Sequence, residues 1–172
     1  KKISLLSKKK YITDKLPGNF KRIGFILNSF PDSKIIHLQR NPMAICWSNY
    51  KSNFNSIGMG FTLNQEYTAE YYLLYKDLMN FWNERYPEKI ININYENLVE
   101  NFEHEVKELF SKLQLNWEKH LYDFHKNERP VETASFMQVR NKIYKKSSEQ
   151  WRGYKEYLKP MIKILSKNSI DY

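Results

Sequence analysis

The stretch KIIHLQRNPMAICWSNY, residues 34–50, combines the two patterns that decide the fold. Its first part, KIIHL, is short, rich in β-branched residues and almost continuously apolar, which is typical of a strand buried on both faces of a parallel sheet. Asn41-Pro42 then turns the chain, and MAICWSNYKSNF has the length and pattern of a helix. The stretch therefore predicts a strand followed directly by a helix.

The flanking segments extend this pattern to a βαβ unit. Upstream, NFKRIGFILNSF has apolar residues at helical spacing and ends before Pro31, which predicts a helix. Downstream, EKIININY predicts a second strand. Between the strands, residues 65–85 predict a long amphipathic helix with an apolar face of Tyr67, Tyr71, Leu74, Leu78, Phe81 and Trp82. Strand, helix and strand together predict an α/β fold with a parallel sheet flanked by helices.

The second half of the chain predicts further helices and one long loop. NLVENFEHEVKELFSKLQL predicts a helix, and SEQWRGYKEYLKPMIKIL predicts a closing helix for which Ser148 is a candidate cap. The polar region between them begins with a short helix and then indicates a functional loop or disorder. Without repeats or linkers, residues 1–172 predict one domain, in which residues 1–10 form a basic, flexible N-terminal segment.

Composition narrows the kinds of partner and compartment. With 28 Lys and Arg against 19 Asp and Glu, the formal charge is +9, which favours an anionic partner. The alternative is that lysine is abundant in this chain without a role in binding. The single cysteine, Cys46, excludes an internal disulfide and has apolar neighbours, which indicates a core thiol in a reducing compartment. No membrane span, signal peptide or metal-ligand spacing is visible, so we expect a cytoplasmic domain without a metal.

The chain places a cation and a hydroxyl where an anion could bind. Ligands of open parallel sheets lie beyond the carboxyl ends of the strands, and Arg40 follows the KIIHL strand. Its guanidinium could hold an oxyanion with two parallel hydrogen bonds. Ser48, about two turns into the next helix, could reach the same anion if that helix packs beside it. On geometry alone, a salt-bridged surface arginine and a solvated serine are the more common interpretations.

These residues also carry a resemblance to a known family. RNPMAICWS resembles the 3′-phosphate-binding motif of sulfotransferases that use 3′-phosphoadenosine 5′-phosphosulfate (PAPS). The chain is similar to bacterial sulfotransferase domains associated with tetratricopeptide repeats and, more distantly, to tyrosylprotein sulfotransferases. The matching stretches keep the family's order from about Ile12 to Leu165: ITDKLPGNFKRIGFI, SKIIHLQRNPMAICWSNY, YYLLYKDLMNFW, INYENLVENFEHEVKELF, LNWEKHLYDFHKNERPVETASFMQVRNKIYKKS and QWRGYKEYL. The resemblance implies a P-loop-like sheet and transfer of a sulfuryl group from PAPS to a hydroxyl or tyrosine acceptor.

The resemblance also implies which residues bind PAPS or its product, 3′-phosphoadenosine 5′-phosphate (PAP). Arg40 and Ser48 would bind the 3′-phosphate, and Tyr95, in NYENL, would contact the adenine. Arg140 and Lys145, in a basic run, would fold over the nucleotide, with Lys145 reaching the 3′-phosphate. The alternatives are a core tyrosine with a satisfied hydroxyl and a solvated charged loop.

Two further residues would act at the reacting group. Lys15, in DKLP, matches the lysine of the NKDPF-type stretch of tyrosylprotein sulfotransferases. A cation there would stabilise the negative charge that builds on the bridging oxygen during in-line transfer. Ser135, three residues before Gln138, aligns with the serine of that family's STDQV segment, which contacts the cofactor near the reaction centre. The alternative for Lys15 is an ion pair with Asp14 on a loop.

The match lacks two parts of the family's machinery. None of the five glycines lies in a glycine-rich phosphate loop ahead of ITDKLP, and no catalytic base is evident. The chain thus resembles the C-terminal part of a sulfotransferase domain, and the resemblance implies a truncation at its N-terminus. It could be a fragment, a split protein whose partner chain supplies the loop, or a degenerate domain that binds PAP, PAPS or a sulfated ligand without catalysis. After sulfuryl transfer and binding without catalysis, a third possible function is nucleic-acid binding, but it rests on charge and aromatic residues alone.

Overall fold

The computed structural model describes residues 10–52, 54, 57–126, 143 and 145–172. The chain divides after Ser33 into two compact units. In the N-terminal unit, the 3-10 helix η1 (Pro17–Arg22) leads into α2 (Ile23–Ser29). The helix predicted from NFKRIGFILNSF is therefore confirmed.

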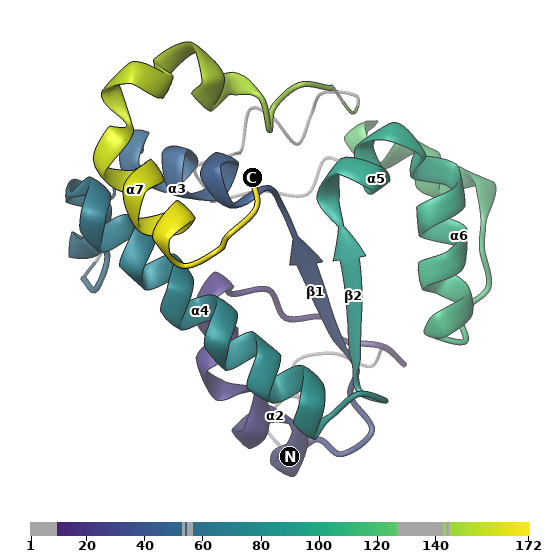
Figure 1. Ribbon diagram of the computed structural model, residues 1–172. Helices are drawn as coiled ribbons and strands as arrows, with labels where there is room; N and C mark the ends of the chain where they lie inside the picture. Colours follow the sequence, from purple (N-terminus) through teal and green to yellow (C-terminus); the bar gives the residue numbers. More distant parts are fainter. Residues whose placement is uncertain (1–9, 53, 55–56, 127–142, 144) are drawn as a thin grey trace. The chain divides into compact units, whose positions relative to one another are not determined.

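The second unit, from Lys34 to Tyr172, contains a small parallel sheet and helices. Its elements follow in the order β1 (Ile35–Gln39), α3 (Pro42–Lys51), η2 (Gly60–Leu63), α4 (Gln65–Arg85), β2 (Ile90–Asn94), α5 (Tyr95–Glu100), α6 (Phe102–Lys112), η3 (Lys119–Lys126), η5 (Gln150–Tyr157) and α7 (Lys159–Lys167). In Figure 1, β1 and β2 point the same way, and α5 starts at their carboxyl ends. Ile35 is paired with Ile90 and Gln39 with Asn94, so the predicted parallel βαβ unit is confirmed.

The strand β1 is less covered than its apolar sequence predicted. Ile36 and Leu38 remain 49% and 48% exposed, so the prediction of burial on both faces is wrong for the described chain. Side chains alternate along a strand, which puts these two on one face and His37 on the other. His37 contacts Tyr75 of α4, so only that face of β1 is covered by α4.

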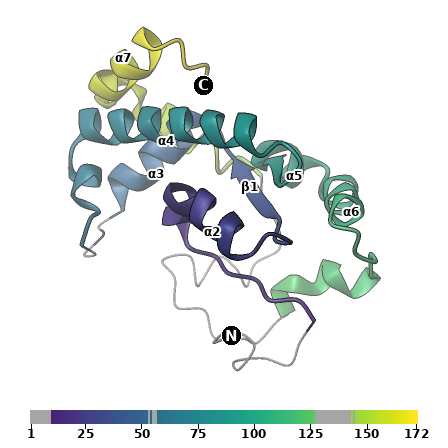
Figure 2. The ribbon, with the colours of Figure 1, turned by 90° about the horizontal axis from the view of Figure 1, so that it is seen from below.

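The main hydrophobic core lies among α3, α4 and α7. The N-terminal half of α4 lies beside α3 and α7 (Figures 1 and 2), and η5 adds Trp151 to the same core. The buried members of the core are Met43, Ala44, Cys46, Ala69, Trp151, Leu158, Met161, Leu165 and Ile170. Cys46 is fully buried, as expected of a core thiol, and this burial raises its pKa to about 12.

The helix α4 has the predicted bounds, but part of its predicted buried face is wrong. Tyr67, Leu74 and Phe81 are 60%, 67% and 53% exposed, whereas Thr68, Ala69 and Met79 are buried. Burial of Thr68 is tolerated because its hydroxyl can donate to the carbonyl oxygens of Phe61 and Asn64, at 3.0 and 2.7 Å.

The remaining elements follow the prediction with two differences. η3 matches the predicted short helix, but the helix predicted from NLVENFEHEVKELFSKLQL is interrupted at Asn101, so its residues fall in α5 and α6. The closing helix is instead divided at Leu158 into η5 and α7, and Pro160 lies in the first turn of α7, where proline is well tolerated. None of the helices in the described ranges is both long and apolar enough to span a membrane.

A series of side-chain hydrogen bonds selects the tautomer of neutral His37. Asn92 Nδ2 donates to Asn83 Oδ1 at 2.8 Å, so Asn92 Oδ1 faces His37 Nδ1 as an acceptor, at 2.7 Å. Nδ1 therefore carries the hydrogen, and Nε2 accepts a hydrogen bond from the Tyr75 hydroxyl. Burial lowers the pKa of His37, despite the opposing effect of its hydrogen bond to Asn92.

We expect His37 to make the protein less stable in mild acid. Its pKa is lower in the folded than in the unfolded chain, so the unfolded chain binds more protons as the pH falls through about 6.5. The free energy of unfolding, measured with urea at a series of pH values, should decrease between about pH 7 and 5. His37→Gln should flatten this part of the profile; identical profiles for the two proteins would contradict the expectation.

Candidate functional site

The carboxyl ends of the two strands bring two predicted site residues together. Arg40 follows β1, and Tyr95 begins α5 directly after β2. Because Gln39 pairs with Asn94, the next residue of each strand lies at the same edge of the sheet. The Cζ atom of Arg40 lies 4.8 Å from the centroid of the Tyr95 ring, a cation–π contact.

A third segment, just before η5, closes on the same point. Arg40 Nε donates to Ser148 Oγ at 3.1 Å, and Ser148 Oγ donates to Glu96 Oε1 at 2.5 Å. The neighbouring Ser147 shares a hydrogen bond of 2.8 Å with the Tyr95 hydroxyl. Segments that follow β1, follow β2 and precede η5 are thus joined by side-chain hydrogen bonds.

The start of α3 is fixed to the same group. Asn41 N donates to Glu96 Oε1 at 3.1 Å, and Asn41 Oδ1 accepts from Ala44 N at 2.9 Å. With Pro42 as its first residue, α3 thus has both a side-chain cap and a proline suited to that position. The positive end of the helix dipole therefore lies next to Arg40.

Arg40 retains hydrogen-bonding capacity for a ligand. The guanidinium has five N–H donors, and its hydrogen bond within the described part of the chain uses Nε. Its two terminal nitrogens can therefore present four N–H groups to an oxyanion. Contact with the Tyr95 ring and the bond to Ser148 together restrict the plane of the guanidinium.

A cleft of about 210 Å³ lies beside Arg40, between β1 and α4. It is lined by His37, Gln39, Arg40, Tyr72, Tyr75, Lys76, Met79, Asn80 and Asn83. Arg40 and Lys76 are cationic, and none of the lining residues is an aspartate or a glutamate. The local potential therefore favours an anion.

Ser48 and Tyr95, two further residues predicted to bind the nucleotide, both lie in the described part of the chain. Ser48 is half-buried in the second turn of α3, and within the described residues no hydrogen bond joins it to Arg40. Its role in phosphate binding therefore stays a prediction. The ring of Tyr95 lies against Arg40 and its hydroxyl shares a hydrogen bond with Ser147, and its contact with an adenine also stays a prediction.

The remaining predicted site residues are Lys15, Lys145, Ser135 and Arg140. Lys15 is exposed ahead of η1 in the N-terminal unit; Asp14 accepts a hydrogen bond from Asn19 at 2.7 Å, and the described ranges contain no Lys15–Asp14 ion pair. Lys145 is exposed, two residues before Ser147. Ser135 and Arg140 lie outside the described residues.

Three residues of this group were not predicted as site residues: Glu96, Ser147 and Ser148. The prediction that Ser148 caps the closing helix is wrong, because η5 begins at Gln150 with Glu149 as its N-cap residue and no side-chain cap bond. Ser148, only 7% exposed, instead bonds Arg40 and Glu96. The sequence signal that could have identified Glu96 is its position directly after Tyr95, the residue that follows the second predicted strand.

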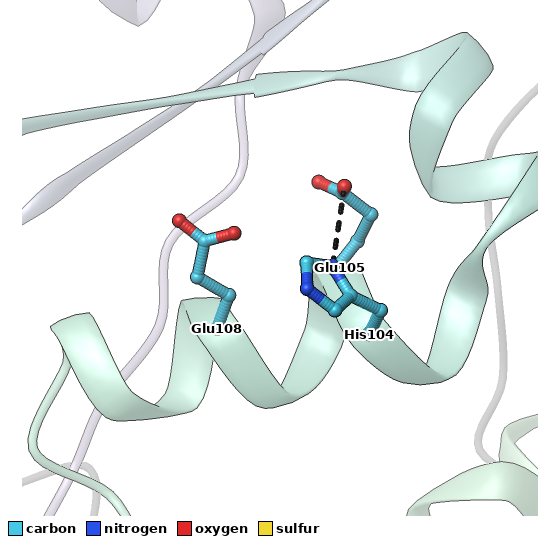
Figure 3. Close-up of side chains that lie close together, drawn as sticks. All are labelled: His104, Glu105 and Glu108. Carbon is cyan, nitrogen blue, oxygen red and sulfur yellow. Dashed lines mark ion pairs between the residues drawn. The ribbon is translucent and has the colours of Figure 1, made fainter.

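A separate cluster on α6 offers potential metal ligands. His104, Glu105 and Glu108 have ligand atoms within 4.8 Å of one another (Figure 3). However, Glu108 is paired with Lys112 at 2.5 Å, which lowers the pKa of its carboxyl group, and His104 pairs with Glu105 at 3.7 Å. Ion pairs on a largely exposed helix face account for the cluster, so we assign no metal to it.

Comparison with known proteins identifies the class. The model of the family described as "Sulfotransferase family" matches residues 4–119, and the chain therefore belongs to the sulfotransferase family. An uncharacterized protein of Aquifex aeolicus (strain VF5) is 40% identical over 156 residues, which are 90% of this chain. The chain spans 20% of the length of that relative. Helices around a small parallel sheet agree with the α/β fold expected for this family.

Proposed function

We propose that this chain binds the 3′-phosphoadenosine part of PAPS beyond the carboxyl ends of β1 and β2. It would do so as part of an enzyme that transfers a sulfuryl group to a hydroxyl or tyrosine acceptor. The proposal rests on how Arg40 is oriented and on the hydrogen-bonding capacity that its guanidinium retains. Its guanidinium is oriented by Ser148 and Tyr95, and its terminal nitrogens make no hydrogen bond within the described residues. Membership of the sulfotransferase family supports PAPS as the anion.

In this proposal, the residues have distinct roles. Arg40, Ser48 and Lys145 bind the 3′-phosphate, while Tyr95 stacks on the adenine and Arg140 covers the nucleotide. At the sulfuryl group, Lys15 and Ser135 stabilise the charge that develops on the bridging oxygen. The transfer requires only charge stabilisation and proton removal from the acceptor, so the proposal includes no metal.

Other parts of the enzyme would come from outside this chain. A glycine-rich loop for the 5′-phosphosulfate and a general base would be supplied by a further segment of a longer protein or by a partner chain, which would complete a P-loop-like sheet. The small share of the Aquifex relative that this chain spans supports such an arrangement. The proposal also includes a cytoplasmic location, supported by the free, buried Cys46.

A second candidate function is binding of PAP or a sulfated ligand without transfer. It is favoured by the hydrogen bonds of Glu96, the carboxylate nearest to Arg40 in the hydrogen-bonded group. This carboxylate accepts from Asn41 N and Ser148 Oγ through the same oxygen, so it is engaged in holding the site. A carboxylate occupied in this way is poorly suited to removing a proton from an acceptor.

Calorimetric titration of the 172-residue chain tests the proposal. We expect saturable binding of PAP, at least ~10-fold tighter than that of adenosine 5′-monophosphate (AMP), because AMP lacks the 3′-phosphate that Arg40 would bind. A folded chain that binds neither nucleotide, or both equally, would overturn the proposal. Incubation of the full-length protein with labelled PAPS and an acceptor separates sulfuryl transfer from binding alone. A protein that binds PAP but forms no PAP from PAPS under these conditions favours the binding role.

A further inference from the structure

Glu96 is the point at which three segments of the C-terminal unit are joined. Its Oε1 atom accepts from Asn41 N, at the start of α3, and from the hydroxyl of Ser148, ahead of η5. Glu96 itself lies in the first turn of α5, directly after the residue that stacks on Arg40. The carboxylate thus links the start of α3 and the segment ahead of η5 to α5.

The hydroxyl of Ser148 separates this carboxylate from the guanidinium. A serine hydroxyl has one hydrogen to donate and two lone pairs to accept. Here the hydrogen is directed at Glu96, and a lone pair receives the Nε hydrogen of Arg40. The two hydrogen bonds of this buried hydroxyl therefore run in one direction, from the cation through the hydroxyl to the anion.

This arrangement keeps the charge of Arg40 available. A direct contact between Glu96 and Arg40 would be a charge-assisted ion pair that could occupy the terminal nitrogens of the guanidinium. With Ser148 between them, the bond to the protein uses Nε, and the ring of Tyr95 restrains the plane. The terminal nitrogens then keep a fixed direction, which reduces the entropy lost when an anion binds.

We propose that Glu96 and Ser148 are positioning residues for the anion site. Ser148 orients Arg40 and prevents Glu96 from pairing with it directly, while Glu96 fixes both Ser148 and the start of α3. The inference rests on the proposed function, because it takes the bound anion to be the 3′-phosphate of PAP or PAPS. A purely structural role would affect the binding of every nucleotide alike, whereas a positioning role acts on the contact with the 3′-phosphate.

The test compares the affinities of the chain for PAP and AMP by calorimetry. Their ratio isolates the contribution of the 3′-phosphate. We expect Ser148→Ala to lower this ratio about tenfold. Ser148→Thr should keep it, because threonine supplies the same hydroxyl. Ser166→Ala is the matched control: its hydroxyl bonds Tyr172 at the end of the chain, and the ratio should not change.

Further variants test the coupling and guard against misfolding. Because both residues act on one contact, Ser148→Ala added to Arg40→Ala should lower the ratio no further. If Ser148→Ala does not fold in a thermal melt, Glu96→Ala, at a half-buried position, should lower the ratio similarly. An unchanged ratio in the folded variants, or equal losses for PAP and AMP, would overturn the inference. A wild-type ratio near 1 would instead overturn the proposed function.

Discussion

Replacing Arg40 with alanine should weaken PAP binding by about 100-fold or more, beyond what calorimetry detects for a micromolar ligand. The variant loses charge-assisted hydrogen bonds to the 3′-phosphate, which are each worth about 1.5–3 kcal/mol, so the loss amounts to at least about 3 kcal/mol. Arg40→Lys should bind PAP with intermediate affinity, because lysine keeps the charge but not the planar fork. AMP should bind to wild type and to Arg40→Ala with similar affinity.

The chain offers a matched control for this variant. Arg152 also binds through Nε, to Glu149, and also lies over an aromatic ring, 5.1 Å from the centroid of Trp151. Arg152→Ala should leave the PAP affinity within about twofold, because screened surface charges contribute little. If Arg40→Ala bound PAP as tightly as wild type and showed a comparable thermal transition, Arg40 would not hold the phosphate.

Replacing Leu165 with alanine should be among the most destabilising single changes in the C-terminal unit. Leu165 is fully buried in the core between α4 and α7, and removal of a buried leucine side chain costs about 2–5 kcal/mol. A two-stranded sheet adds little stability of its own, so the packing of the helices must supply most of it. Urea unfolding followed by circular dichroism should show a large decrease in the transition midpoint.

Leu74→Ala is the matched control, because it makes the same change at a side chain that is 67% exposed. Its effect on the free energy of unfolding should stay within about 0.5 kcal/mol. Periodicity alone predicts a large loss for Leu74→Ala as well, since it assigns Leu74 to the buried face of α4. A large loss for Leu74→Ala with a small loss for Leu165→Ala would contradict the core seen in the structure.

The secondary structure was largely predictable, whereas burial was not. β1, α4 and β2 have local signals, namely β-branched runs and residues repeating at three and four, and these elements lie where they were predicted. The buried face of α4 was predicted only in part, because tyrosine and phenylalanine suit both a core and a half-exposed position. Burial of Thr68 depends on acceptors in Phe61 and Asn64, which are visible only in the folded chain.

The candidate site shows the same division. Arg40 and Tyr95 could be selected because each directly follows a predicted strand, and parallel strands end at the same edge of a sheet. The partners that orient Arg40 could not be selected in this way. Ser148 lies 108 positions from Arg40 and 52 from Glu96, and no local pattern connects residues so far apart.

The sequence by itself determined the order of strands and helices, the net positive charge, the membership of a known family and the residues placed at the strand ends. These properties depend on near neighbours in the chain or on direct similarity to relatives. Only the tertiary structure decided which face of α4 is buried and that a serine hydroxyl stands between Glu96 and Arg40. Both depend on hydrogen bonds and packing between segments that meet only after folding, because burying a polar group is costly where it finds no hydrogen-bond partner.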